Sequence, residues 1–219
     1  CVTRRQRQMC IRDRYYSIQG ESSYSGLPCV FIRLTYCNLR CSYCDTEYAF
    51  YEGEDIKIKD IIKKINSYKC DLVEITGGEP LLQKNYIKLI EELEENGKKV
   101  LIETGGSLTI KNISKNTHII LDLKSPSSNM EHKNLWDNLK YIKKTDEIKF
   151  VIGNKTDYDW SKKIIKENDL ENKCLILMSP VYDKIDKEKI INWILKDNLR
   201  VRFQIQLHKE IWDKDKKGV

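Results

Sequence analysis

The chain has 219 residues, of which 40% are hydrophobic and 33% charged, a balance typical of one folded domain. No apolar run approaches about 18 residues, which excludes a membrane-spanning helix of ordinary length. The formal net charge is +6, but residues 1–14 hold five arginines and one aspartate, whereas the remainder carries 34 basic and 32 acidic residues. This distribution excludes a global basic field able to steer nucleic acid.

Residues 1–14 differ in composition from the rest of the chain. Five of the nine arginines lie there, while the remainder strongly prefers lysine. We therefore expect residues 1–14 to be a non-native or disordered tail, followed by a single domain over residues 15–219. The tail lacks the apolar core of a secretory signal, so a basic targeting segment is the alternative. Because three of the eight cysteines are clustered and no signal precedes them, we expect reducing, cytoplasmic surroundings.

The cluster of Cys37, Cys41 and Cys44 follows an apolar, β-branched strand expected at 30–35 and interrupted by Arg33. The spacing C-x3-C-x2-C is typical of a loop around a compact inorganic centre, and thiolates are the usual ligands of iron–sulfur clusters. Three cysteines leave one iron of a [4Fe-4S] cluster open to another ligand, much as a catalytic zinc site keeps one open position. Structural zinc and metal-free core cysteines are the alternatives, but no second C-x2-C pair is present.

Beyond this loop, strand-like and helix-like segments alternate, which favours a parallel sheet with right-handed crossovers. The expected helices are 58–68, 85–96, 135–142, 157–168 and 187–196, and the expected strands are 72–76, 99–104, 118–123, 148–152, 174–178 and 201–206. Polar residues recur at the strand ends, where α/β barrels carry their chemistry. They are Thr76, Glu103, Thr104, Asp122, Lys124, Ser125, Gln204 and Gln206. The predicted fold class is α/β, a partial TIM-like β/α barrel.

The cysteine triplet resembles the signature of the radical S-adenosylmethionine (SAM) superfamily, whose open iron binds the amino and carboxylate groups of SAM. A second element, Thr76-Gly77-Gly78-Glu79-Pro80, follows an apolar run and resembles the superfamily's GGEP motif. Its glycines allow close backbone approach to a ligand, and Glu79 offers a carboxylate to an ammonium group. The resemblance implies an incomplete barrel of the radical SAM type, a [4Fe-4S] cluster and bound SAM.

Three shorter elements resemble the 7-carboxy-7-deazaguanine synthase family: Gln19-Gly20-Glu21, the run from Arg33 to Cys41, and Cys44-Asp45-Thr46. Members of that family are carbon–nitrogen lyases that convert 6-carboxy-5,6,7,8-tetrahydropterin to 7-carboxy-7-deazaguanine with loss of ammonia, in queuosine and 7-deazapurine biosynthesis. Ser22 departs from the family pattern, in which another glycine is frequent.

The resemblance assigns roles to individual residues. The catalytic cluster ligands are Cys37, Cys41 and Cys44. The cofactor-binding residues are Tyr43, Asp45, Gly78, Glu79, Lys124, Ser125 and Pro126. The substrate-binding residues are Ile18, Gln19, Gly20, Glu21, Arg33, Thr76 and His208. Thr46 is expected to bind Mg²⁺, which prefers oxygen ligands. The resemblance also implies an external electron donor like flavodoxin or ferredoxin and a homodimer, with no nucleic-acid or membrane partner.

Two other classes of function stay open from the sequence. A radical SAM activase, which installs a glycyl radical on a partner protein, shares the cysteine triplet but does not need Gln19, Glu21 and Arg33 around a small heterocycle. A zinc-stabilised binding module uses the same cysteines without redox chemistry. Nucleic-acid binding through the basic tail is a weaker third alternative.

Overall fold

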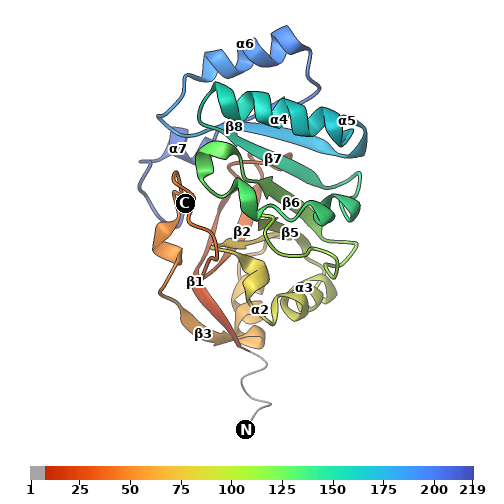
Figure 1. Ribbon diagram of the computed structural model, residues 1–219. Helices are drawn as coiled ribbons and strands as arrows, with labels where there is room; N and C mark the ends of the chain where they lie inside the picture. The colour runs from red at the N-terminus through yellow and green to blue at the C-terminus, as the bar shows by residue number, and fades with distance from the viewer. Residues whose placement is uncertain (1–7) are drawn as a thin grey trace.

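A nine-stranded sheet runs through the molecule in the order β3-β1-β2-β4-β5-β6-β7-β8-β9 (Figure 1). The computed structural model describes residues 8–219. The strands are β1 (Gln8–Ile18), β2 (Pro28–Leu34), β3 (Glu54–Lys57), β4 (Leu72–Gly77), β5 (Lys99–Thr104), β6 (His118–Leu123), β7 (Glu147–Ile152), β8 (Leu175–Pro180) and β9 (Arg202–Phe203). From β2 to β9 along the sheet all neighbours are parallel, whereas β1 is antiparallel to both β2 and β3. The α/β prediction and the parallel sheet are therefore confirmed.

Five helices cover the outer face of the sheet: α2 (Ile58–Asn66), α3 (Tyr86–Glu95), α4 (Lys155–Glu167), α5 (Leu170–Lys173) and α6 (Lys187–Asp197). The short helix α7 (Leu207–Ile211) lies elsewhere, with the Leu207 N–H donating to the Gly20 carbonyl. Figure 1 shows α2 next to α3, which packs against β5, and α4 and α5 beside β7 and β8. On α2 the buried side chains Ile58, Ile61, Ile62 and Ile65 recur at helical spacing and join the main core. Within the part of the chain described, no helix is both long and apolar enough to cross a membrane.

The inner face of the sheet is polar, and the candidate site lies on this face. Along the central strands, outward side chains such as Val73, Ile75 and Ile148 belong to the apolar core under the helices. Because side chains alternate between faces, the intervening residues point inward. These inward residues include Glu74, Thr76, Glu103, Asp122 and Lys149, which come from four neighbouring strands. The concave side of the sheet therefore holds charged groups rather than a second apolar layer.

The expected helix at 135–142 is wrong in type. The structure has a five-residue 3-10 helix, Trp136–Lys140, in its place. The buried Asn138 explains the difference, because its side chain binds the backbone of the preceding β5–β6 connection: Oδ1 accepts from the Ile110 N–H at 3.1 Å, and Nδ2 donates to the carbonyls of Gly106 at 3.2 Å and Leu108 at 2.9 Å. These tertiary contacts outweigh the local helix propensity, which is only a weak preference.

We expect Asn138→Ala to lower the free energy of unfolding by about 3 kcal/mol, because three backbone groups lose their partner and buried polar groups are costly when unpaired. Urea denaturation under anaerobic conditions measures this change. Asn172→Ala is the matched control, since Asn172 hydrogen-bonds at the exposed surface, and a change of at most about 0.5 kcal/mol is expected there. Equal effects for the two variants would contradict the role given to Asn138.

The N-terminal segment also differs from expectation. β1 begins at Gln8 and crosses the expected boundary at residues 14/15, pairing with β3 through Met9↔Ile56 and with β2 from Ile11 onward. Met9 and Ile11 are buried, because apolar residues at alternate positions face the core along β1. This burial stabilises the strand despite the high arginine content of the segment. The expectation of disorder is wrong for residues 8–14, and residues 1–7 lie outside the described residues. The non-native origin of the segment stays a prediction.

The C-terminal part is shorter in strand and richer in helix than expected. The last strand, expected at 201–206, is only the two residues of β9, and α7 follows where no helix was expected. Two elements earlier in the chain were also not expected from the sequence, the short helix α5 and the edge strand β3. Since Gln204 and Gln206 lie outside the strand, their side chains reach inward from a loop.

Candidate active site

The cysteine loop, residues 36–46, leaves the carboxyl end of β2 directly beside the end of β4. The Gly78 N–H donates to the Leu34 carbonyl at 3.1 Å, and the Glu79 N–H donates to the Tyr36 carbonyl at 2.7 Å. A Cβ on Gly78 would lie 2.2 Å from the Tyr36 carbonyl oxygen and 3.1 Å from Cys37 Cβ. The GGEP element and the cysteine loop therefore pack backbone against backbone, which only glycine permits here.

Contacts within the protein hold the loop in place. Arg40 donates to the carbonyls of Cys37 at 2.7 Å and Leu39 at 2.6 Å, and its guanidinium lies 4.3 Å from the centre of the Phe50 ring. On the far side of the loop, the Ser42 N–H donates to the Ser128 carbonyl at 3.1 Å. The three cysteines are thus presented between the end of β2 and the segment after β6.

The chemistry of the three thiols fits an iron–sulfur cluster. Cys37, Cys41 and Cys44 are partly exposed and not in disulfides. Burial raises the pKa of each thiol, that of Cys44 to about 11. The thiols therefore become thiolate ligands when a bound metal ion displaces their protons, which are released to solvent. Among residues 8–219, no three His, Cys, Asp or Glu side chains converge on a point where they could hold one metal ion. In a [4Fe-4S] cluster each thiolate binds a different iron, whereas structural zinc needs its ligands around one centre.

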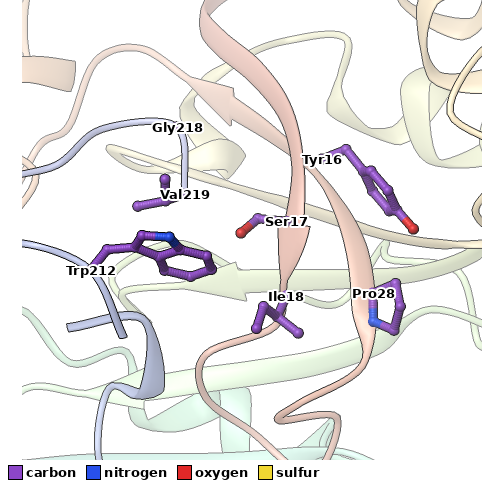
Figure 2. Close-up of a pocket in the computed structure, with 7 residues that line it drawn as sticks. All are labelled: Tyr16, Ser17, Ile18, Pro28, Trp212, Gly218 and Val219. Carbon is purple, nitrogen blue, oxygen red and sulfur yellow. The ribbon is translucent and has the colours of Figure 1, made fainter. Parts of the chain in front are cut away.

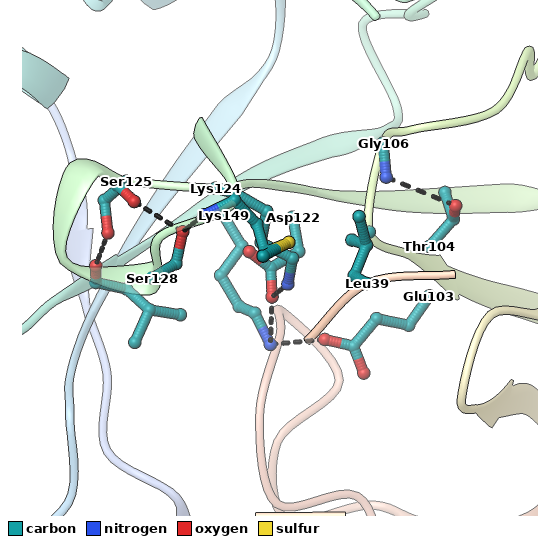
Figure 3. Close-up of polar contacts among 12 residues, drawn as sticks. Leu39, Glu103, Thr104, Gly106, Asp122, Lys124, Ser125, Ser128 and Lys149 are labelled. Carbon is teal, nitrogen blue, oxygen red and sulfur yellow. Dashed lines mark hydrogen bonds and ion pairs between the residues drawn. The ribbon is translucent and has the colours of Figure 1, made fainter. Parts of the chain in front are cut away.

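The segment after β6 faces the cysteine loop. Tyr43 Oη and Ser125 Oγ are 3.3 Å apart, and Ser125 Oγ donates to the Val151 carbonyl at 2.6 Å. Lys124 Nζ lies 2.9 Å from Asp122 Oδ2; although burial opposes its charge, Asp122 keeps the pKa of Lys124 above its usual range. Figure 3 shows Lys124, Ser125 and Asp122 together at the end of β6. The expected cofactor residues Tyr43, Lys124, Ser125 and Pro126 thus lie beside one another.

Glu79 has a structural role that the sequence did not indicate. Its fully buried carboxylate accepts three hydrogen bonds, from the Leu81 N–H at 3.0 Å, Thr104 Oγ1 at 2.8 Å and the Gly105 N–H at 2.8 Å. These bonds tie the end of β4 to the end of β5. Burial raises the pKa of Glu79. The Glu79 carboxylate therefore holds the GGEP turn in place through its hydrogen bonds to Thr104 and Gly105 at the end of β5.

The Gln19-Gly20-Glu21 element meets the C-terminal segment inside the open barrel. Gln19 Nε2 donates to Glu74, and Glu21 accepts from Gln206 Nε2 at 3.0 Å. The Leu207 N–H donates to the Gly20 carbonyl at 2.9 Å. A Cβ on Gly20 would lie 2.3 Å from His208 Nδ1, so the absence of a side chain at this position leaves room for the imidazole.

Arg33 lies on the inner face of β2 and pairs in register with Thr76 of β4. Its terminal nitrogen donates to Tyr15 Oη at 2.7 Å, and its Nε is 3.4 Å from Asp13 Oδ1. The five residues Arg33, Thr76, Gln19, Glu21 and His208 therefore lie around one polar interior, and their substrate-binding role stays a prediction.

Ile18 is the exception among the expected substrate residues. Its side chain lines a separate shallow hollow of about 300 Å³ on the outer side of β1 (Figure 2). The hollow is lined by Tyr16, Ser17, Ile18, Pro28, Trp212, Gly218 and Val219. The Ile18 side chain is thus directed away from the groups with which it was predicted to act.

Asp45 links the cysteine loop to the C-terminal helix. Its Oδ2 accepts from Lys209 Nζ at 2.6 Å and Gln206 Nε2 at 2.9 Å, and Thr46 Oγ1 donates to Oδ1 at 2.9 Å. Burial acts to raise the pKa of Asp45, but the Lys209 ammonium outweighs it and holds the pKa well below its usual range. Gln206 therefore donates to both Asp45 and Glu21 and connects the cofactor side of the site to the substrate side.

Sequence reasoning missed two interior residues, Glu74 and Lys149. Both lie on inward positions, and Lys149 contacts Glu21 and Glu103. The available signal was the alternation in Glu147-Ile-Lys149-Phe, where two charged residues share one face of a buried strand.

Comparisons with known proteins agree with this geometry. The Radical SAM superfamily profile matches residues 31–194. The 7-carboxy-7-deazaguanine synthase of Koribacter versatilis is 40% identical over 96% of this chain and 100% of its own length, and that of Chlorobaculum tepidum is 39% identical over 95% and 96%. The crystal structure of QueE from Escherichia coli has a TM-score of 0.77 at 24% identity, covering 92% of this chain and 95% of its own.

These findings confirm the partial-barrel fold and do not favour the activase alternative, because the named relatives are synthases. The family resemblance also supports a [4Fe-4S] cluster and SAM as the cofactors. The cysteine loop, the GGEP turn and the polar interior described above are the features that such an enzyme requires. The chain belongs to the 7-carboxy-7-deazaguanine synthase family of the radical SAM superfamily.

Proposed function

We propose that this protein converts 6-carboxy-5,6,7,8-tetrahydropterin to 7-carboxy-7-deazaguanine with loss of ammonia, in 7-deazapurine biosynthesis. The observation that carries the proposal is the joint placement of Glu21 and Asp45, which share the Gln206 amide at 3.0 and 2.9 Å. One belongs to the element assigned to the pterin and the other to the loop assigned to the cluster. A small substrate bound by Glu21 therefore lies next to the cysteine loop that holds the cluster.

The chain's own residues divide the binding tasks. The Arg33 guanidinium has the planar donor geometry that suits the pterin carboxylate. Gln19 and Glu21 supply an amide and a carboxylate for the donors and acceptors of the aminopyrimidinone ring. Tyr43 and the segment from Lys124 to Pro126 line the cofactor side. When bound, the cluster and SAM supply a one-electron cleavage that yields a radical able to abstract hydrogen.

Several finer features belong to this proposal. Thr46 provides a hydroxyl oxygen for Mg²⁺, which keeps several waters and takes few protein ligands. An external donor of the flavodoxin or ferredoxin type reduces the cluster, and the enzyme acts as a homodimer in the cytoplasm, where thiolate ligands stay reduced. The Cys44-Asp45-Thr46 element supports the role of Thr46, and the cysteine triplet supports the need for an electron donor.

The test is anaerobic turnover after reconstitution with iron and sulfide and chemical reduction. SAM is added with and without 6-carboxy-tetrahydropterin, and chromatography follows 5′-deoxyadenosine and 7-carboxy-7-deazaguanine. Both products are expected. Deoxyadenosine without the deazaguanine would overturn the proposed substrate while keeping radical SAM chemistry, and stoichiometric zinc without iron would support a binding module instead.

We expect Arg33→Met to raise the KM for the pterin by about 10- to 100-fold, because a charge-assisted hydrogen bond contributes about 1.5–3 kcal/mol. Initial rates of deazaguanine formation at varied pterin concentration measure it. Arg200→Met is the control, since Arg200 hydrogen-bonds to Asn172 at the surface, and its KM is expected to stay at the wild-type value. An unchanged KM for Arg33→Met would rule out Arg33 as the carboxylate ligand.

A further inference from the structure

Lys149 is a buried ammonium surrounded by three carboxylates. It projects inward from β7 with a side chain that is only 8% exposed. Nζ lies 3.1 Å from Glu21 Oε2, in hydrogen-bonding contact with Glu103, and 3.7 Å from Asp122 Oδ2. Figure 3 shows the Lys149 ammonium between Asp122 and Glu103. These carboxylates come from three separate places, the loop after β1, β5 and the end of β6.

On the substrate side, Lys149 is the cation in contact with Glu21 and Glu103, because the Arg33 guanidinium pairs with Asp13 and Tyr15 instead. The second nearby ammonium, Lys124, is already paired with Asp122 at 2.9 Å. Burial and the neighbouring Glu103 carboxylate raise the pKa of a fourth carboxyl group, Glu74, well above its usual range, which favours its neutral form. Burial raises the pKa of Glu103 as well, and the Lys149 ammonium opposes that rise. Glu21 and Glu103 share Lys149, and burying a carboxylate without a counter-ion is costly.

Each of the two carboxylates keeps an oxygen that does not contact Lys149 in a hydrogen bond. Glu21 Oε1 accepts from Gln206, whereas Glu103 Oε2 has a 3.5 Å contact with Thr76 Oγ1. The Glu103 side chain is 26% exposed, so it opens to the interior. Because the Lys149 ammonium holds one oxygen of Glu21 and one of Glu103, the orientation of each carboxylate is fixed. The second oxygen of each group therefore points in a defined direction.

We propose that Lys149 is a positioning residue for the pterin: its ammonium holds one oxygen of Glu21 and one oxygen of Glu103 and so directs the two carboxylates toward the ring. The inference rests on the proposed function, because it concerns the same substrate. It adds a residue on β7 and a partner carboxylate on β5 to the binding arrangement. Lys149 acts through the two carboxylates, and its loss therefore affects pterin recognition more than SAM binding, which lies on the side of Lys124 and Tyr43.

The experiment compares Lys149→Met, Lys149→Arg and the control Lys162→Met in anaerobically reconstituted protein. Lys162 pairs with Asp197 at 2.9 Å on the outer helices, so its variant removes an ion pair away from the interior. Equilibrium binding gives the dissociation constants of 6-carboxy-tetrahydropterin and of SAM for each protein. Lys149→Met is expected to weaken pterin binding by about 30-fold, with SAM affinity within about threefold of wild type. Lys149→Arg, which keeps the charge, is expected to recover part of the loss.

A purely structural ion pair predicts a different result, in which both affinities fall by the same factor or neither changes, and either result overturns the inference. If Lys149→Met does not fold, Lys149→Met is made in a Glu103→Gln background, which removes one carboxylate charge along with the ammonium. The double variant is expected to bind pterin about tenfold more weakly than Glu103→Gln alone, because Glu21 still loses its counter-ion. Equal affinities would overturn the inference.

Failure of the proposed function gives a distinct outcome. If the wild-type protein forms no 7-carboxy-7-deazaguanine and binds no pterin, both the function and the role of Lys149 are overturned. If wild-type protein forms the product and Lys149→Met does so with equal efficiency, only the role of Lys149 is overturned.

Discussion

Cys41→Ala is expected to abolish 5′-deoxyadenosine formation and to prevent assembly of a stable four-iron cluster. Cys41 lies between Cys37 and Cys44 in a loop that offers three thiols, and the resemblance leaves no fourth protein ligand in reserve. Loss of one thiolate leaves a second iron without a protein ligand. Burial raises the pKa of the remaining thiols, so they revert to protonated groups when no cation is bound. Iron and sulfide content, the absorbance of the reconstituted protein and chromatography of the products measure the effect.

Cys174→Ala provides the matched control. Cys174 is also unpaired but lies next to β8, outside the cysteine loop. The variant is expected to hold as much iron as wild type and to turn over normally, with the same outcome expected for Cys70→Ala. A Cys41→Ala protein that keeps four irons and forms deoxyadenosine would show that the loop does not ligate the cluster.

Gly78→Ala is expected to reduce deoxyadenosine formation by at least about 100-fold, because displacement of catalytic groups by about 1 Å can cost that much. The added methyl group would lie 2.2 Å from the Tyr36 carbonyl oxygen and 2.6 Å from its carbonyl carbon. These are backbone atoms, so no side-chain rotation relieves the clash. The cysteine loop must move away from the GGEP turn, and Cys37 moves with it. Deoxyadenosine formation and iron content in the same preparation measure the loss.

Gly97→Ala separates this effect from general destabilisation. Gly97 follows α3 with φ +76°, and a Cβ there meets no atom within 4 Å. Alanine at this position costs about 1 kcal/mol of stability through backbone strain, yet the site is untouched and turnover is expected to stay at the wild-type rate. Wild-type turnover by Gly78→Ala would mean that the loop tolerates displacement and that the close packing is not required.

The two predictions address different properties of the same loop. Cys41→Ala removes a cluster ligand but leaves the backbone conformation of the loop unchanged. Gly78→Ala keeps all three cysteines but displaces the backbone of the loop. A protein in which only the first variant is inactive would need the loop's chemistry but not its contact with β4. The hydrogen bonds from Gly78 and Glu79 to β2 and the loop argue that both are needed.

The sequence alone determined the features whose physics is local. The spacing of Cys37, Cys41 and Cys44 is set within one loop, and the glycines of the GGEP element act within one turn. The alternation of apolar strands with amphipathic helices was also readable, because periodicity reflects which face each element buries. The strands expected at 99–104 and 118–123 coincide with β5 and β6.

Tertiary structure decided the features that depend on partners distant in sequence. Lys149 reaches Glu21 across 128 positions, and Gln206 reaches Asp45 across 161. The buried Asn138 replaced an expected helix by a short 3-10 turn, and pairing to β2 and β3 drew residues 8–14 into a strand. The physical reason is the same in each case. A side chain's charge partner and a segment's backbone partner are fixed only when the sheet forms and brings strand ends together, and no local pattern records which groups will meet there.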